Sequence, residues 1–333
     1  MRPRDGSEKK GGRRKASSTE EGLLPAIEAI VADHTAGSPV DDGIRWTNHS
    51  PRQISEELRD EGFCICPDTV RRLLREEMGL GVRQAFKDEA AREYPFRNEQ
   101  FEYIAELREE YLRKRWPVLS IDTKKKELLG DFFRPGTAYT DGCLHVLDHD
   151  FGDQRMVPYG IYDVAHNDGF MLLAVGADNS ELASDALWQW WRQIGRKRYW
   201  HASGLLLLCD CGGSNGNRHY LFKQDMKDLA IELRRDIRVA HYPPSCSKYN
   251  PIEHRMFCHV TRSLQGVVLN SLEVAKRFIS KTTTSTGLHV VVETTNRIYT
   301  RGRKACQDFL EQMPVEFDSF LSDLNYTLDS FGY

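Results

Sequence analysis

The chain has 333 residues and a mass of 38.3 kDa, which is long enough for one large hydrophobic core or two moderate ones. Its 29% charged and 40% hydrophobic residues are ordinary for a globular protein, and no stretch approaches the ~20 apolar residues of a membrane span. A net charge of −3 neither indicates nor excludes a nucleic-acid partner, because the basic residues gather in local clusters.

The cysteines and the N-terminus indicate the cellular compartment. Eight cysteines in a chain of this length are too sparse for a disulfide framework, and their C-x-C spacings lack the C-x2-C pairs of a zinc site. No apolar segment follows the charged N-terminus, so we expect neither secretion nor membrane insertion. The sequence therefore predicts reduced thiols and a cytoplasmic protein.

Residues 1–21 are rich in Arg, Lys, Gly and Ser and contain almost no apolar residue. Such a composition does not support a core, so this segment is predicted to be a disordered basic arm. Weak contact with phosphates and a purely solvated tail are the two interpretations of its charge, and the solvated tail is favoured.

Residues 22–80 are expected to form three short helices. Apolar positions at helical spacing predict the first over residues 23–32. The second has strong start signals: Ser50 as the N-cap, Pro51 at the first helical position and Gln53 at the third position of a capping box. Pro67 opens the third helix, whose apolar residues Val70, Leu73 and Leu74 face inward.

The third helix carries its arginines on the face opposite these apolar residues: Arg71, Arg72 and Arg75. Three short helices with a basic last one are typical of a helix-turn-helix unit, in which the last helix lies in the major groove of DNA. The alternative is a small helical bundle with a solvated arginine face. We therefore predict a helix-turn-helix-like DNA-binding domain over residues 22–80, followed by a linker over residues 81–96.

The rest of the chain is organised around residues 118–127, VLSIDTKKKE, an apolar run that ends in Asp122 and three lysines. A helix over residues 97–115 precedes it and is stopped by Pro117. The first strand begins there, and residues 159–163 and 169–175 are further strands of an antiparallel meander. Helices are expected over residues 180–198, 222–233 and 251–264, with strands at 205–208 and 238–241 between them.

Three strands followed by helix, strand, helix, strand and helix is the ribonuclease-H-like order. The predicted fold class is therefore α/β, a ribonuclease-H-like mixed sheet with flanking helices, over a catalytic domain at residues 97–333. The paired tryptophans Trp190 and Trp191 are assigned to core packing in preference to a base-stacking surface.

Three acids stand at the ends of these elements. Asp122 and Asp210 each follow an apolar strand, and Glu253 stands near the start of a helix. Two Mg²⁺ ions about 4 Å apart activate the attacking oxygen and stabilise the leaving oxygen in phosphodiester cleavage. Because Mg²⁺ prefers oxygen ligands and keeps waters, a few converging carboxylates suffice to hold it. The sequence predicts that these three acids bind Mg²⁺ or Mn²⁺, two ions in all.

Each acid also has a structural explanation. Asp122 starts a turn equally well, and Asp210 caps the loop before Gly212 and Gly213. Glu253 is the third residue of a helix start with Asn250 as its cap, and spacing alone favours capping there. The glycine-rich stretch 212–216 contains neither a P-loop nor a dinucleotide-binding motif, so a nucleotide-binding enzyme is weakly supported.

These motifs together resemble one family. The segments are SIDTKKKEL at 120–128, PYGIYD at 158–163, Asp210 with GGSNG at 212–216, HYPP at 241–244, SK at 247–248, IEHR at 252–255 and TTTSTGL at 282–288. They are similar to the ISAzo-type insertion-sequence transposases, also described as the Rhodopirellula-type transposase DDE domain, from about residue 45 to the C-terminus. The region around Pro243 and Asn250 also resembles the mariner-like transposases.

The resemblance implies a DDE transposase in which Asp122, Asp210 and Glu253 are catalytic and bind the divalent metals. Such an enzyme cleaves transposon ends and uses the freed 3′ hydroxyl to attack target DNA, in a bacterial, nucleoid-associated setting. Because two ends are joined, a homodimer or higher oligomer is expected in the DNA complex. Phosphate contacts are then expected from five further residues: Lys124, Lys125, Lys126, Lys248 and Arg255.

The sequence also departs from the family pattern. Members usually carry a further helix-turn-helix segment before a Gly-Gly-Arg-Arg-Lys-like linker, and this sequence begins close to that linker, at Gly11 to Lys15. Two alternatives to the transposase therefore stay open: a transposase-derived DNA-binding protein without catalysis, and a metal-dependent nuclease or integrase of the same fold.

Overall fold

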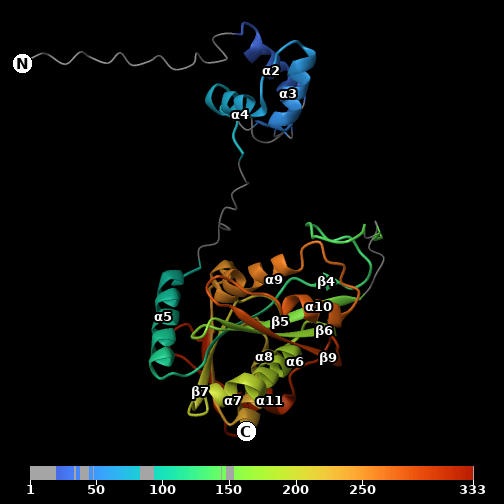
Figure 1. Cartoon of the computed structure of the whole chain (residues 1–333). Helices are drawn as coiled ribbons and strands as arrows, with labels where there is room; N and C mark the ends of the chain where they lie inside the picture. The colour runs from blue at the N-terminus through green and yellow to red at the C-terminus, as the bar shows by residue number, and fades with distance from the viewer. Residues whose placement is uncertain are drawn as a thin grey trace, which may run out of the picture. The chain divides into compact units, whose positions relative to one another are not determined.

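A computed structural model describes residues 20–33, 35–37, 45–47, 49–82, 94–143, 145–147 and 154–332. The chain divides into two compact units, Met1–Asp88 and Glu89–Tyr333, which are considered separately (Figure 1). The predicted basic arm lies outside the described residues except for its last two positions, and so does most of the predicted linker. No helix in these described ranges is long and apolar enough to cross a membrane.

The first unit contains the three predicted helices: α2 (Leu23–Asp33), α3 (Pro51–Asp60) and α4 (Pro67–Glu76). The capping box is confirmed, since Oγ of Ser50 accepts from the N–H of Gln53 and the Gln53 side chain accepts from the N–H of Ser50. A short antiparallel pair, β1 (Thr35–Gly37) and β2 (Arg45–Thr47), lies between α2 and α3 and was not predicted.

The core of the first unit is formed by the apolar stripes of the three helices. Val70, Leu73 and Leu74 are buried as predicted and pack with residues of the other two helices, among them Leu23, Ile27, Ile54 and Leu58. Ser55 is buried as well, and its hydroxyl donates to the carbonyl of Ile65 at 2.5 Å, which fixes the turn before α4. The three arginines of α4 are exposed.

The second unit is built on one nine-stranded sheet in the order β10-β11-β8-β7-β3-β5-β6-β9, with β4 paired to β5. The strands are β3 (Val118–Thr123), β4 (Glu127–Leu128), β5 (Arg155–Asp163), β6 (Asp168–Gly176), β7 (Gly204–Cys209), β8 (Asp236–His241), β9 (His289–Tyr299), β10 (Glu316–Phe317) and β11 (Asn325–Leu328).

The central five strands have the predicted topology. β3, β5 and β6 form an antiparallel meander, while β3, β7 and β8 run parallel to one another. This is the ribonuclease-H-like mixed sheet. β9 extends it in parallel beside β6, and β11 and β10 extend it beside β8. These three outer strands were not predicted.

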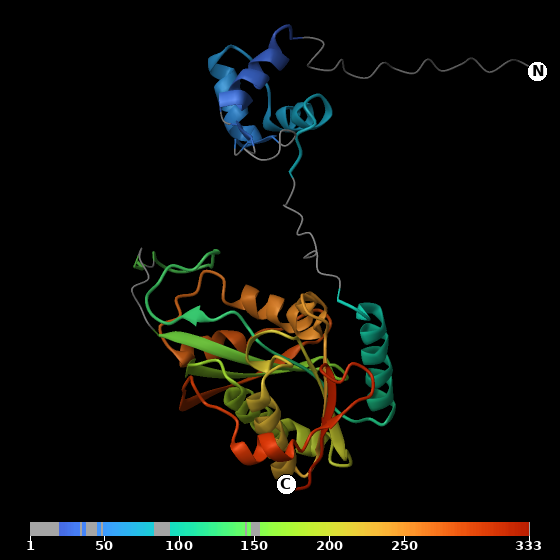
Figure 2. The ribbon, with the colours of Figure 1, turned by 180° about the vertical axis from the view of Figure 1, so that it is seen from behind.

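Helices cover both faces of the sheet (Figures 1 and 2). One face carries α6 (Ser180–Trp190), which continues through a short π-helix, η1 (Trp191–Gly195), into α7 (Arg196–Arg198), and also carries α8 (Tyr220–Leu233). The other carries α5 (Arg97–Arg113), the short π-helix η4 (Glu253–Phe257), α9 (Cys258–Ser263) and α10 (Leu272–Ile279). The short elements are η2 (Gly213–Asn215), η3 (Ser247–Tyr249) and α11 (Gln307–Gln312).

The alternation of side chains along β3 sorts its residues between the two faces. Leu119 and Ile121 belong to the cluster formed with α6 and α8, whereas Val118 packs with α5. Because side chains on a strand alternate, Ser120 and Asp122 share the face of Val118. Trp190 and Trp191 are both buried in the α6 cluster, as expected for core residues.

Candidate active site

Asp122 and Asp210 lie at the same end of two neighbouring parallel strands. Ser120 of β3 is paired with Leu208 of β7, and each acid follows two residues later on its own chain segment. Val118 and Leu208 pack in the same cluster, so the two-residue period carries both acids to one face of the sheet. The topology therefore brings together two acids that lie far apart in the sequence.

Glu253 reaches the same point from the first turn of η4, and a buried polar network fixes that turn to β3. Oγ of Ser120 donates to Oδ1 of Asn250 at 2.5 Å and accepts the N–H of Ile252 at 2.9 Å. Nδ2 of Asn250 donates to the carbonyl of Ile121 at 3.2 Å. Ser120 and Asn250 are fully buried.

This network changes the interpretation of Asn250. Its side chain does not cap the following helix; the hydroxyl of Ser120 receives the N–H of Ile252 instead. The cap thus comes from the strand that carries Asp122, and it holds the turn of Glu253 beside that strand. The charge of Glu253 there is near enough to help raise the pKa of Asp122.

Gly160 permits this close approach. It stands directly opposite Asp122 in the ladder between β3 and β5. A Cβ at this position would lie 2.5 Å from Cε1 of Phe257 and 2.8 Å from Cε of Met256. Since η4 packs on the backbone of Gly160, the absence of a side chain there sets how near Glu253 comes to the sheet.

Partial burial and the mutual repulsion of the three acids raise the pKa values of carboxyl groups in the site. Burial, together with the negative charges of Asp210 and Glu253, raises the pKa of Asp122 to about 8, against one hydrogen bond from the N–H of Thr123. Burial also raises the pKa of Asp210, and Glu253 and Asp178 add to the effect. Cations placed among these groups would relieve the repulsion.

The donor set suits a hard divalent cation. All three side chains offer carboxylate oxygens, the ligands that Mg²⁺ and Mn²⁺ prefer. Within the part of the chain that the structure describes, no group of three or more His, Cys, Asp and Glu side chains is arranged to hold a metal ion by itself. An open set of carboxylates fits Mg²⁺, which usually keeps several waters and binds through one or two carboxylates plus substrate phosphate.

A buried histidine, His241, is hydrogen-bonded to the backbone of Asp210. Nδ1–H of His241 donates to the backbone carbonyl of Asp210 at 2.9 Å, and Nε2 accepts from the hydroxyl of Tyr326 at 3.2 Å. Burial lowers the pKa of His241 to about 4, so the ring is neutral at physiological pH. The donor and acceptor roles are then those of a single tautomer.

A fourth acid, Asp178, lies beside the site and was missed in the sequence analysis. Its Oδ1 accepts from the hydroxyls of Thr123 at 3.0 Å and Ser214 at 2.9 Å, and Nζ of Lys126 lies 3.7 Å from its Oδ2. Asp178 thereby links the residue after Asp122 to the loop after Asp210. The signal that could have found it is the one used for the other two acids, a carboxylate just after an apolar strand.

The residues expected to contact phosphates differ in exposure. Lys124 is only 6% exposed, and its Nζ lies 2.7 Å from Oε1 of Glu127, which also binds Arg134. Its ammonium is thus directed into the protein rather than toward a ligand. Lys126 is directed toward Asp178. The remaining three are exposed: Lys125, Lys248 and Arg255.

The predicted basic face of α4 belongs to the first unit. Arg71 forms an ion pair with Asp68 at 2.8 Å, one turn earlier on the same helix. Arg72 and Arg75 are exposed beside it.

The fold and the site define a class of protein. A mixed sheet of this order, with acids at the ends of its two central parallel strands, is the ribonuclease-H-like arrangement. The family model described as the Rhodopirellula transposase DDE domain matches residues 26–330, and the chain belongs to this family.

Solved structures with some similarity are complexes of the Mos1 mariner transposase. The paired-end complex with Mn is 16% identical over 83% of this chain and 73% of that chain, with a TM-score of 0.43. The strand transfer complex is 16% identical over 83% and 72%, with a TM-score of 0.42. The paired-end complex with Mg is 15% identical over 83% and 74%, with a TM-score of 0.42. No curated protein matches the sequence.

Proposed function

We propose that this member of the family is a metal-dependent transposase that cleaves DNA strands at insertion-sequence ends and transfers them to target DNA. Asp122, Asp210 and Glu253 are its catalytic and metal-binding residues. The observation that supports the proposal is that Asp122 and Asp210 follow neighbouring parallel strands at the same end, while buried hydrogen bonds from Ser120 hold the turn of Glu253 to β3.

In this proposal the protein's own residues bind the cations and hold the catalytic acids in position. Burial and the acidic neighbours of Asp122 favour its protonated form. Asp122 loses this proton when it binds a cation. Ser120 and Asn250 keep Glu253 in place, and His241 holds the backbone of Asp210. When bound, Mg²⁺ or Mn²⁺, two ions in all, would activate the attacking oxygen and stabilise the leaving oxygen of the phosphodiester.

The two units then have different tasks. Residues 22–80 form the helix-turn-helix-like DNA-binding domain and residues 97–333 the catalytic domain. The partners are transposon ends and target DNA, and the assembly on DNA is a homodimer or higher oligomer because two ends are joined. Phosphate contacts from Lys125, Lys248 and Arg255 are supported by their exposure.

The test is cleavage and joining of labelled DNA that carries the ends flanking the gene, with Mg²⁺ or Mn²⁺. We expect metal-dependent cleaved and joined products from the native protein and from Asp308→Asn, an exposed acid on α11 used as control. Asp122→Ala, Asp210→Asn and Glu253→Gln should give none while still binding the DNA.

The two alternatives predict other results. Cleavage without joining would favour a nuclease of this fold. Tight, salt-sensitive binding with no products from the native protein would favour a transposase-derived DNA-binding protein. Products from Asp210→Asn would show that this residue is wrongly assigned.

A further inference from the structure

A cavity of about 420 Å³ opens next to Asp178, on the side of the sheet that α6 and α8 cover. Four segments line it: the turn after β6 with the first residue of α6 (Asp178, Asn179, Ser180), Ser214 of η2, the residues that lead into α8 from Arg218 to Phe222, and the segment after β9 from Thr300 to Arg303. Its volume lies in the range of roughly 300–1,000 Å³ that holds small ligands. One nucleotide fits such a volume, whereas a double helix does not.

Asp178 joins this cavity to the carboxylate site. It lines the cavity and accepts hydrogen bonds from Thr123, the neighbour of Asp122, and from Ser214 in the loop after Asp210. Both partners stand next to the proposed catalytic segments. The cavity therefore adjoins the segments that follow Asp122 and Asp210.

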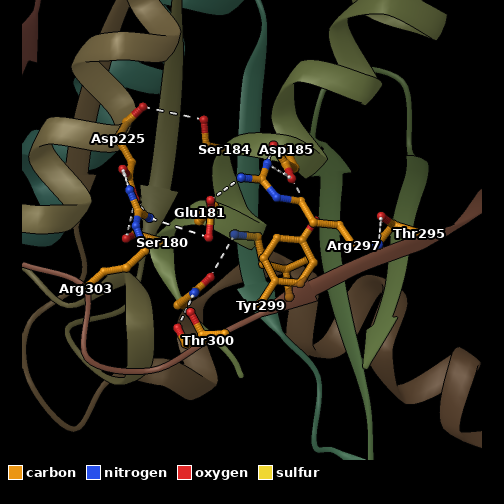
Figure 3. A network of polar contacts seen from close by, with 12 residues as sticks. Ser180, Glu181, Ser184, Asp185, Asp225, Thr295, Arg297, Tyr299, Thr300 and Arg303 are labelled. Atoms are coloured by element: carbon orange, nitrogen blue, oxygen red, sulfur yellow. Dashed lines mark hydrogen bonds and ion pairs between the residues drawn. The ribbon is translucent and has the colours of Figure 1, made fainter. Parts of the chain in front are cut away.

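The wall of the cavity is fixed by a polar network between α6, α8 and the segment after β9 (Figure 3). The guanidinium of Arg303 donates to both oxygens of Asp225 at 3.0 and 2.9 Å, and Asp225 also accepts from the hydroxyl of Ser180 at 2.6 Å. Nδ2 of Asn179 donates to the carbonyl of Thr300 at 3.0 Å. The charge of Arg303 is thus balanced by Asp225, and the arginine serves as a brace.

The end of β9 is held in the same way. Nη1 of Arg297 donates to Asp185 at 2.8 Å, and the hydroxyl of Tyr299 donates to the same carboxylate at 2.7 Å (Figure 3). The N–H of Ala177 donates to the carbonyl of Tyr299 at 2.9 Å, which ties the strand to the turn before Asp178. Because its walls are braced from three elements, the cavity is preformed rather than made by its ligand.

The groups left to meet a ligand include two arginines and an aromatic ring, beside the exposed His219. Arg218 and Arg301 line the cavity, are exposed, and form no ion pair with any residue that the structure describes. Tyr220, at the start of α8, is 51% exposed. Guanidinium groups bind phosphate, and an aromatic ring stacks on any base. The acid in the lining, Asp178, is already engaged by Thr123 and Ser214.

We infer that this cavity binds a single unpaired nucleotide of the DNA strand, next to the phosphodiester at the carboxylates. Arg218 and Arg301 hold its phosphates, and Tyr220 stacks on its base. The inference rests on the proposed function, because it takes DNA as the substrate of the neighbouring site. Beyond the proposed function, it states that one nucleotide of the bound DNA is unpaired and occupies the cavity, and that the cavity does not select among the four bases.

The test measures binding rather than cleavage. The full chain is titrated, with Ca²⁺ present, into two fluorescent DNAs of one sequence, one fully paired and one with a single unpaired 3′ nucleotide. We expect the second to bind about tenfold more tightly, since stacking one base on an aromatic side chain contributes roughly 1–3 kcal/mol. Tyr220→Ala should remove this preference, and Tyr220→Phe should keep it.

The arginines are tested by salt dependence. Arg218→Gln and Arg301→Gln should each lower the slope of log K against log salt by about 0.7 for single-stranded DNA, while Arg301→Lys and the exposed control Arg196→Gln keep it. An unpaired 5-iodouracil is expected to crosslink at or beside Tyr220, as mapped by mass spectrometry. Thermal unfolding checks that each variant is folded.

Equal binding of the two DNAs by the native protein, or glutamine variants that behave like Arg196→Gln, would overturn the inference. Failure of the proposed function looks different, because it gives no cleaved or joined products whatever the binding preference. If the native protein prefers the DNA with the unpaired nucleotide but gives no cleaved or joined product, the assignment of the cavity stands and the proposed transposase function is wrong.

Discussion

At the scale of single residues, the ionisation of Asp122 links the candidate site to stability. Its pKa is 3.8 in an unfolded chain and is raised to about 8 in the fold by burial and by Asp210 and Glu253. Between these values the folded state binds more protons than the unfolded state, so folding stability falls as pH rises from about 4 to about 8. At neutral pH the metal-free fold therefore keeps Asp122 largely protonated, at a cost in stability that binding of a cation would relieve.

Replacing Asp122 with Asn removes this destabilisation. We expect Asp122→Asn to be more stable than the native protein by about 2–4 kcal/mol near pH 8, with little difference near pH 4. Urea unfolding at a series of pH values measures this, and taking the difference between the two proteins cancels the contribution of His241. Mn²⁺ should raise the melting temperature of the native protein only. A difference that does not change with pH would contradict the assignment of a raised pKa to Asp122.

Ser120 is the residue on which the placement of Glu253 depends. Ser120→Ala leaves the N–H of Ile252 and the side chain of Asn250 without their buried partner. Leaving buried polar groups unpaired costs about 1–3 kcal/mol each. We expect a stability loss of that size by urea unfolding, together with weaker stabilisation by Mn²⁺. Ser280→Ala, at an exposed serine that follows α10, is the control and should change stability by less than about 0.5 kcal/mol.

At this scale the sequence predicted the candidate acids but not their surroundings. An acid after an apolar strand is a local pattern, which is why Asp122 and Asp210 stood out. The partner of Asn250 is 130 residues away, so only the fold could reveal that Ser120 provides the cap. The burial of Lys124 follows from Glu127 folding back over it, which a run of three lysines does not indicate.

At the scale of elements, the distance between η4 and the sheet depends on Gly160. Gly160→Ala would place a methyl group 2.5 Å from Cε1 of Phe257, so η4 must move away from β5. Overpacking of this kind costs about 1–3 kcal/mol. We expect that loss in urea unfolding and, because Glu253 moves with η4, a smaller Mn²⁺-induced rise in melting temperature.

Gly142 provides a matched control for Gly160. A Cβ at Gly142 meets no atom within 4 Å, so Gly142→Ala should leave stability within about 0.5 kcal/mol and metal stabilisation unchanged. Equal behaviour of the two alanine variants would mean that Gly160 does not set the position of η4.

The elements that were predicted have strong local signals, and those that were missed do not. β7 is a continuous apolar run, β3 is apolar at Val118, Leu119 and Ile121, and α3 has a complete capping box. β9 mixes apolar residues with Glu293, Asn296 and Arg297, because it is an outer strand with many partly exposed positions. β1, β2 and β10 have two or three residues each and are held only by their partner strands, so no periodicity marks them.

At the scale of the whole molecule, the charge of the chain is less informative than its distribution. A net charge of −3 is compatible with DNA binding because each unit has exposed basic side chains of its own. In the first unit they are the arginines of α4, and in the second unit they include Arg218 and Arg301. Each unit also has its own hydrophobic core. Binding of DNA and binding of metal are therefore expected to be separable by mutation.

Two variants test this separation. Arg72→Gln with Arg75→Gln should weaken binding of the end DNA and lower its salt slope by about one for each of these arginines that binds a phosphate. Stabilisation by Mn²⁺ should be unchanged, because the carboxylates are in the other unit. Asp122→Asn should do the reverse, and Arg52→Gln, an exposed arginine on α3, should alter neither. A salt slope that stays the same in the double variant would mean that the basic face of α4 is a solvated surface of a helical bundle, and that recognition of the ends lies elsewhere in the chain.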